Sequence, residues 1–353
     1  MGFFFQRAVC AVMVALALSL LAGSRRGVAA PVSSCVWDGR HDVAPCLQKS
    51  INAAASGKPL FLPKGRWPLG SALSLASNLT LQGNGQTTLV ALPGNKSNPL
   101  LLRGVNISNV LVAGILLDGG GAMFTSRAPA VKLDHVKKVL FDHITIQHTP
   151  GIGIVIEANS ADTGVEASTL DDIGNRWKIT HNRQDRGQGL VFCCGDSNFG
   201  NYAISDHFAD IGLDALQLSN QNDFTALKNT FTLEDGQMEL LPSPDYPAAI
   251  FTPFSSNAII SGNVIDGAQG NGIDAPGLQN SVISSNLIQH CGAAAIGLFS
   301  TYDTKAPSHD VIIRSNLMSG NARWKLSKGN GGIVIGRGSS VGLLMQDNKL
   351  SGD

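Results

Sequence analysis

Residues 205–231, SDHFADIGLDALQLSNQNDFTALKNTF, contain the pattern that decides the fold. A short apolar run is followed here by a polar residue at a fixed offset, and this form recurs along the chain. The recurring blocks are FDHITI, ITHNRQ, ISDHFA, ALKNTF, ISGNVI, ISSNLI, IRSNLM and MQDNKL. The aligned polar positions are His143, Asn182, His207, Asn229, Asn263, Asn286, Asn316 and Asn348.

The spacing of these blocks indicates a solenoid. The tightest intervals are 22 to 25 residues, and longer intervals occur where loops intervene. A repeat of this length cannot bury its apolar face alone, so successive repeats must stack. In a stack of parallel strands equivalent residues lie above one another, and a column of Asn at a turn forms a hydrogen-bonded ladder. We expect His143 and His207 to be members of that ladder rather than catalytic or metal-binding residues.

The composition favours an all-β chain with many short strands. The sequence has 353 residues, 40 of them Gly, with 6% aromatic and 15% charged residues. That length suits two domains or one solenoid. Val, Ile and Leu occur in runs of three to five and not in long helical stripes, which favours the solenoid.

The first 30 residues are typical of a secretory signal peptide. Arg7 precedes the apolar run AVCAVMVALALSLLAG, and GVAA provides a small-residue cleavage site. Retention as a membrane anchor is the alternative, since Arg25, Arg26 and Pro31 surround that site. We expect a secreted or periplasmic protein with no membrane span after cleavage, because no other segment is long and apolar enough.

The charge balance argues against a nucleic-acid partner. The chain has 26 basic and 26 acidic residues, and removal of the signal leaves 23 basic residues. Binding of nucleic acid requires a basic surface, which a neutral chain does not supply.

The cysteines fit an exported protein. Export permits disulfides, and Cys35 and Cys46 at the start of the first helical pattern are the expected pair. Cys193, Cys194 and Cys291 remain, and their odd number requires at least one free thiol. No Cys or His spacing resembles a zinc site, and metal ligands stay unassigned.

These coils resemble the right-handed parallel β-helix of the pectate lyase-like superfamily, whose turns carry Asn ladders. The stretch HDVAPCLQKSINAAASGKPLFLPKGRWPL at residues 41–69 is similar to the opening of many of its enzymes, with an Asp N-cap, a short amphipathic helix and the first strands. The resemblance implies a cap over residues 31–70, whose helix covers the open end of the solenoid, and a single-stranded β-helix over residues 71–353. It specifies the fold but not the reaction, since the superfamily includes lyases, hydrolases, epimerases and adhesins.

In that superfamily the outer face of the first sheet binds substrate. We align its strands on an inward apolar column: Ile154, Leu190, Leu216, Ile250, Ile273, Ile296 and Ile333. Alternation then points the next residues outward: Val155, Val191, Gln217, Phe251, Asp274, Gly297 and Val334. A third column lies two residues before the aligned position: Ile152, Gln188, Asp214, Ala248, Asn271, Ala294 and Gly331.

The third column is where the similar polygalacturonases carry their catalytic aspartates, in NTD and DD motifs. Only Asp214 matches here, because Leu213 precedes it and Gln188 stands in the neighbouring coil. That departure argues against pectin hydrolysis. An Asp just before a strand can also serve only to bond its own turn.

Long loops beside these strands complete the candidate site. The catalytic candidates are Asp214, Asp185, Asp210 and Asp274. The substrate-binding candidates are Arg186, Gln188, Gln217, Phe251, Asn271, Phe299, Tyr302 and Arg337.

Two chemistries remain open for a polysaccharide substrate. A glycosidase needs two carboxylates, whereas a lyase acting on a uronate needs a base together with Ca²⁺ or Arg, Lys or Asn side chains that neutralise the carboxylate. We therefore expect a monomeric polysaccharide-cleaving enzyme without a cofactor, or with Ca²⁺ if it is a lyase. The alternatives are a uronate C5-epimerase and a non-catalytic, adhesin-like β-helix that binds carbohydrate.

Overall fold

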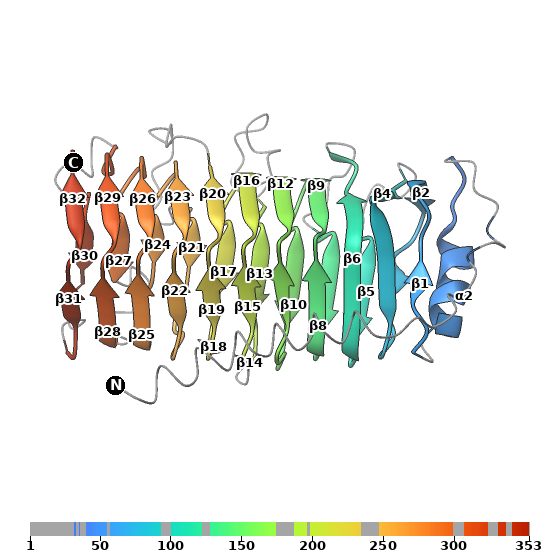
Figure 1. Cartoon of the computed structure of the whole chain (residues 1–353), viewed down its shortest axis with the longest axis horizontal. Helices are drawn as coiled ribbons and strands as arrows, with labels where there is room; N and C mark the ends of the chain where they lie inside the picture. Colours follow the sequence, from blue (N-terminus) through green and yellow to red (C-terminus); the bar gives the residue numbers. More distant parts are fainter. Residues whose placement is uncertain are drawn as a thin grey trace.

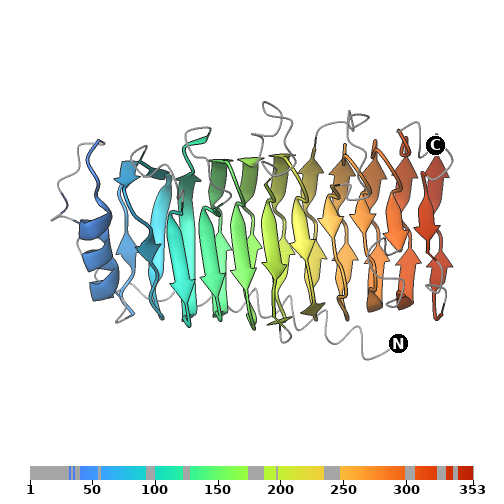
Figure 2. The same cartoon turned by 180° about the vertical axis from the view of Figure 1, so that it is seen from behind.

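The computed structural model is one right-handed solenoid of stacked parallel strands (Figure 1). It describes residues 32, 35, 40–54, 57–92, 100–121, 128–173, 187–195, 198–233, 247–298, 307–323, 331–336 and 341–352. The expected signal peptide lies outside these residues. The predicted fold is confirmed, since the strands stack coil upon coil along the long axis and one helix, α2, closes one end (Figure 2).

Among the described residues the first sheet has ten parallel strands from successive coils. Its strands are β3 (Leu73–Ser74), β5 (Leu102–Val105), β7 (Val131–Asp134), β10 (Ile154–Glu157), β13 (Leu190–Cys193), β17 (Leu216–Leu218), β21 (Ile250–Phe251), β24 (Ile273–Asp274), β27 (Ile296–Leu298) and β30 (Ile333–Ile335).

The remaining long sheet has twenty strands and folds into two faces, which we call the second and third sheets. Both share β4 (Thr80–Ala91) and β6 (Ser108–Asp118). The second sheet adds β1 (Leu60–Phe61), β8 (Lys137–Asp142), β11 (Gly164–Glu166), β15 (Tyr202–Ile204), β19 (Thr225–Leu227), β22 (Ile259–Ser261), β25 (Gln279–Ser284), β28 (His309–Arg314) and β31 (Leu344–Gln346). The third adds β2 (Gly65–Leu69), β9 (Thr145–Thr149), β12 (Thr169–Ile173), β16 (His207–Ile211), β20 (Thr230–Thr232), β23 (Val264–Asp266), β26 (Leu287–Gln289), β29 (Leu317–Ser319) and β32 (Lys349–Ser351). A short pair, β14 (Asn198–Phe199) and β18 (Gln221–Asn222), lies at one corner.

Inward columns of apolar side chains fill the space between the sheets. In the first sheet Leu190, Leu216 and Ile250 are fully buried and pair in register. In the third sheet the rings of Phe208 and Phe231 stack at 4.8 Å between centroids. Parallel strands place identical positions one strand spacing apart, so each apolar column becomes a continuous ribbon of core.

The Asn ladder runs through the corner between the second and third sheets. Asn229 Nδ2 donates to Asn263 Oδ1 at 3.1 Å, and Asn263 Nδ2 donates to Asn286 Oδ1 at 2.9 Å. Each amide also donates to a carbonyl of the preceding coil, as Asn229 does to Ala203 at 3.0 Å. The ladder continues through Asn316 to Asn348, so these predicted members are confirmed.

The prediction for His143 and His207 is wrong. The ladder position of the coil before Asn229 is Asp206, whose Oδ1 accepts a hydrogen bond from Ser168 N at 3.0 Å. His207 pairs with Thr230 and is therefore one residue past the ladder. In the coil of His143 the ladder bond comes from Ile144 N to Ser168 Oγ. The inward apolar residues set the register, so Ile144 and Asp206 stand at the ladder position in the coils of His143 and His207, and Ser168 stands there in the coil between them. Asn182 lies outside the described residues.

His143 belongs instead to a column of left-handed backbone residues one position before the ladder. This column has positive φ in eight successive coils: His143 49°, Ala167 49°, Ser205 58°, Lys228 56°, Gly262 66°, Ser285 57°, Ser315 55° and Asp347 52°. Left-handed residues turn the chain sharply from the second sheet into the third. A corner geometry that is repeated in each coil outweighs the preference for Gly or Asn at these positions.

The helix α2 (Ala44–Ala54) covers the first coil with its apolar face, where Leu47 and Ile51 are buried. Asp42 precedes the helix and bonds its first residue, because Asp42 Oδ1 accepts a hydrogen bond from Ala44 N at 2.9 Å. The disulfide between Cys35 and Cys46 is present and ties the helix to the preceding segment. Among the described residues no helix is long and apolar enough to cross a membrane.

Candidate functional site

The outer face of the first sheet has the register that the sequence predicts. Val155 pairs with Val191, Val191 with Gln217, Gln217 with Phe251, and Phe251 with Asp274. The pre-strand column also aligns, since the backbone N–H after each member bonds the carbonyl of the next one. Gly189 N bonds Asp214 O at 3.1 Å, and Ala249 N bonds Asn271 O at 3.3 Å.

This face changes character along the solenoid. Val155 and Val191 point outward but are only 4% and 3% exposed, and with Cys193 they form a small apolar cluster apart from the main core. Gln217, Phe251 and Asp274 are each partly exposed. On the coils after this apolar cluster, the accessible candidate residues therefore lie on β17, β21 and β24.

Four polar side chains form a connected network at the start of this part. Gln188 Nε2 donates to Gln217 Oε1 and approaches Asp214 Oδ2 at 3.5 Å. Gln217 Nε2 in turn donates to Ser219 Oγ at 2.8 Å. Two adjacent coils thus hold Asp214 and Gln217 in fixed orientations before any ligand binds.

Asp214 and Asn271 make the same structural contact. Asp214 Oδ1 accepts a hydrogen bond from Ala248 N at 2.9 Å, and Asn271 Oδ1 accepts one from Ala294 N at 3.0 Å. Each therefore satisfies the backbone of the coil that follows it, so the contact is structural but is made to the next coil and not to the residue's own turn. The second carboxylate oxygen of Asp214 faces Gln188, so this residue combines a structural bond with a place beside the network.

Asp274 is the outward carboxylate on β24, and its pKa is shifted far from the ordinary value. Its Oδ1 is buried and has no hydrogen-bond partner. Burial and, second to it, the charge of Asp214 raise the pKa of Asp274 to about 7, and a hydrogen bond from the Asn271 amide acts against them. A carboxyl group with such a pKa holds or releases a proton near neutral pH, as a general acid or base must.

The other sequence candidates divide into two groups. Asp210 lies at the end of β16 in the third sheet, where its φ of 50° places it in a corner column with His148, Asp172 and His290. It is thus a turn residue outside the outward column of the first sheet. The remaining candidates, Asp185, Arg186, Phe299, Tyr302 and Arg337, lie outside the described residues.

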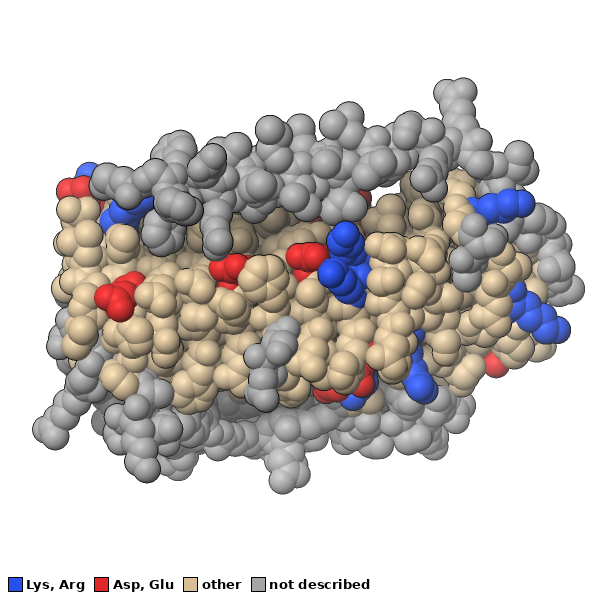
Figure 3. Space-filling view, turned by 90° about the horizontal axis from the view of Figure 1, so that it is seen from below, with Lys and Arg blue, Asp and Glu red and all other residues tan. Residues whose placement is uncertain are grey.

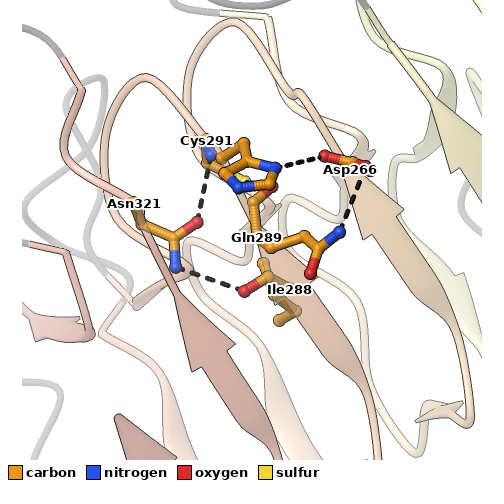
Figure 4. Close-up of polar contacts among 6 residues, drawn as sticks. Asp266, Ile288, Gln289, Cys291 and Asn321 are labelled. Carbon is orange, nitrogen blue, oxygen red and sulfur yellow. Dashed lines mark hydrogen bonds and ion pairs between the residues drawn. The ribbon is translucent and has the colours of Figure 1, made fainter. Parts of the chain in front are cut away.

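The sequence reasoning missed the pairing of two neighbouring cysteines. Cys193 and Cys194 form a disulfide, and Cys291 is the buried free thiol that the odd count required. Figure 4 shows Cys291 beside Asn321: the Cys291 N–H donates to Asn321 Oδ1 at 3.0 Å, and Asn321 Nδ2 donates to Ile288 O at 3.2 Å. The adjacent cysteines in the sequence were the available signal for the disulfide.

The lower face of the molecule carries few charged side chains among the described residues. They are scattered along the solenoid and do not gather into one patch (Figure 3). A polyanion would require a continuous basic surface, which this face does not offer among those residues.

Comparison with known proteins agrees with the architecture. A family model described as "Right handed beta helix region" matches residues 173–350. The fold is similar to the surface adhesin PfbA of Streptococcus pneumoniae, with TM-score 0.62, 14% identity and coverage of 92% of this chain and 91% of that one.

Two enzymes have similar folds. The polygalacturonase of Erwinia carotovora ssp. carotovora gives TM-score 0.60 at 14% identity, covering 93% of this chain and 96% of that one. The mannuronan C-5 epimerase AlgE4 A-module of Azotobacter vinelandii gives 0.58 at 14% identity, covering 90% and 96%. No curated protein sequence matches this chain. At such identities the likeness concerns the fold alone, so the reaction has to be argued from the site.

Proposed function

We propose that this chain, which belongs to the right-handed beta helix family, is a carbohydrate-active enzyme that hydrolyses a glycosidic bond of a polysaccharide on the outer face of the first sheet. Export through the N-terminal segment is part of this proposal. The mass of the protein isolated from its producing cells would test it, with cleavage after Ala30 expected.

The observation that carries the proposal is the unequal pair of carboxyl groups, Asp274 and Asp214. The pKa of Asp274 is raised to about 7, partly by the charge on Asp214. Glycosidases use two carboxyl groups, one that is protonated and donates to the leaving oxygen and one that is ionised and acts on water or the sugar. We assign the general acid to Asp274 and the ionised partner to Asp214, which its bond from Ala248 N orients.

Hydrolysis is favoured over elimination or epimerisation by the side chains around this pair. A uronate-processing enzyme must neutralise the substrate carboxylate with a cation or a basic side chain. The strands β17, β21 and β24 contain no Lys, Arg or His. Gln217, Asn271 and Phe251 instead provide amides and an aromatic ring, which suit the hydroxyl groups and apolar faces of neutral sugars.

A non-catalytic carbohydrate-binding solenoid is the second candidate. The outward Val155 and Val191 and the likeness to an adhesin favour it. A role in binding alone, however, does not explain the buried Asp274 Oδ1 without a hydrogen-bond partner. Such an unsatisfied polar atom lowers the stability of the fold by about 1–3 kcal/mol.

The test is a time course of the purified protein on neutral and uronate-containing polysaccharides, following reducing ends and the ultraviolet absorbance of unsaturated products together. We expect reducing ends without absorbance. Reducing ends that rise with absorbance would mean elimination and would overturn the assignment to hydrolysis.

Two variants distinguish the site from the scaffold. Asp274→Asn should lose at least about 100-fold in kcat while it still binds substrate, since general acid catalysis contributes roughly 100- to 10,000-fold. Asp171→Asn is the matched control, because Asp171 lies on β12 in the third sheet. Loss of activity in both variants, or in neither, would contradict the role of Asp274.

A further inference from the structure

The disulfide between Cys193 and Cys194 lies at the end of β13 and brings two neighbouring sulfur atoms to one side of the chain. Successive residues of a strand normally point to opposite faces. Cys194 has a φ of 67°, so the backbone turns there and its side chain bonds that of Cys193. Cys193 is 8% exposed, and Cys194 is exposed.

A carboxylate stands beside these sulfurs. Glu157 on β10 pairs in register with Cys193, so both occupy one column of the outer face. One ligand atom each from Glu157, Cys193 and Cys194 lies within 4.8 Å of the other two. Lys132 Nζ contacts Glu157 Oε2 at 2.7 Å and holds the carboxylate in place in this state.

The oxidation state decides what this cluster can bind. In the disulfide neither sulfur is a thiolate, so the sulfurs are poor metal ligands. A dithiol reductant would break the S–S bond: each sulfur gains one electron and one proton, and the reductant becomes a disulfide. Two thiols and one carboxylate then face one point. Around a tetrahedral Zn²⁺ such ligand atoms are about 3.5–4 Å apart, so shifts of roughly 1 Å would complete the site.

We propose that Glu157, Cys193 and Cys194 form a redox-gated site for a thiophilic divalent metal ion such as Zn²⁺, which the disulfide closes and reduction opens. Binding displaces the two thiol protons and leaves a fourth coordination position for water. The buried outward side chains of Val155 and Val191 shield one side of the site, which strengthens the attraction between the cation and its anionic ligands. This inference does not depend on the proposed hydrolase activity.

The neighbouring lysine gives the site a specific signature. Lys132 and a bound cation compete for Glu157, because both need the same carboxylate. Lys132→Met should therefore raise the affinity of the reduced protein for Zn²⁺, whereas Glu157→Gln should lower it by at least about tenfold. A site made of the two thiols alone would not respond in opposite directions to these two substitutions.

The experiment is a titration of the full chain with Zn²⁺ alone, without oxygen, against a chromophoric chelator, before and after treatment with a dithiol. We expect one additional Zn²⁺ per chain after reduction, the loss of that ion in Cys194→Ser, and its retention in Cys291→Ser. Circular dichroism checks that each variant is folded. As a second readout, Zn²⁺ should protect Cys193 and Cys194 of the reduced wild type from alkylation, mapped by mass spectrometry.

Three results would overturn the proposal. One is equal binding before and after reduction, which would point to surface histidines such as His290. Another is unchanged affinity in both Glu157→Gln and Lys132→Met. The third is alkylation of both cysteines in the untreated protein, which would mean that the disulfide does not form and cannot act as the gate.

Discussion

Replacement of Asp206 by Asn should stabilise the protein at neutral pH. Asp206 is 1% exposed and occupies a ladder position, and its Oδ2 is buried without a hydrogen-bond partner. In the Asn members the equivalent atom is Nδ2, which donates to the next Asn and to a carbonyl of the preceding coil. Asp206 Oδ2 therefore lies where the ladder requires a donor. It can form these hydrogen bonds only when the carboxyl group is protonated. An Asn at this position would supply the missing donor.

The size of the effect follows from that mismatch. A buried unsatisfied polar group costs about 1–3 kcal/mol, so Asp206→Asn should gain roughly that amount at pH 7. Burial raises the pKa of Asp206 well above its ordinary value, and Glu166 and Asp142 add to the rise, against hydrogen bonds from the backbone of Ser168 and Ile204. The pKa of Glu166 is itself raised by burial and by the charge of Asp142. The pKa of Tyr202 is raised by burial and by the charges of these carboxylates.

The sign of the pH dependence is fixed by the raised pKa. Below the unfolded pKa of about 3.9 both states are protonated, and the acid donates like an amide. As the pH rises from there toward the folded pKa, the unfolded state releases its proton first, so the wild type loses stability relative to the variant. The advantage of Asp206→Asn should be small at pH 4 and large at pH 7.

The assay is urea unfolding of both proteins at pH 4 and pH 7. The matched reverse variant is Asn263→Asp, which places the same mismatch at another buried ladder position and should destabilise the protein at pH 7. If Asp206→Asn is no more stable than the wild type at pH 7, or if its advantage does not change with pH, Asp206 is not a mismatched member of the ladder.

The site and the cap give three more expectations. If Asp274 is the general acid, kcat/KM should fall as the pH rises above about 7, because Asp274 then loses its proton. The measurement is the pH profile of kcat/KM, and the same fall in Asp274→Asn would contradict the role. Phe251→Ala should raise KM roughly tenfold, equivalent to about 1.4 kcal/mol of lost contact with the substrate, with kcat nearly unchanged in steady-state kinetics. Cys46→Ser opens a disulfide between residues 11 positions apart and should cost about 3 kcal/mol in urea unfolding, and addition of reductant to the wild type should reproduce the loss.

The sequence predicts the first sheet well, because the inward apolar residues repeat without interruption. The alignment on Leu190, Leu216 and Ile250 agrees with the observed strand register. The same alignment brings Gln217, Phe251 and Asp274 together on the outer face. Once the inward column is known, the outward residues follow, because successive residues of a strand point to opposite faces.

The ladder is harder to predict, because its members are fixed by the register of the apolar core and not by the kind of polar residue. His143 and His207 resemble Asn in the block pattern, while the true members, Ser168 and Asp206, do not. The protonation of Asp206 depends on burial and on charges from other coils, which no local pattern reveals. The pairing of Cys193 with Cys194 likewise depends on one left-handed residue that strand alternation does not anticipate.

The hydrogen-bond geometry of the ladder does not depend on the number of residues in a coil. Successive members are 23 residues apart between Asn263 and Asn286, but 38 apart between Ser168 and Asp206, yet the corresponding bonds measure 2.9 and 3.0 Å. Insertions are therefore absorbed beyond the corners without any shift of the strands. Loops beside the first sheet can be exchanged, lengthened or shortened one at a time while the scaffold stays unchanged, so variation in binding specificity and conservation of the fold can proceed independently in such a chain.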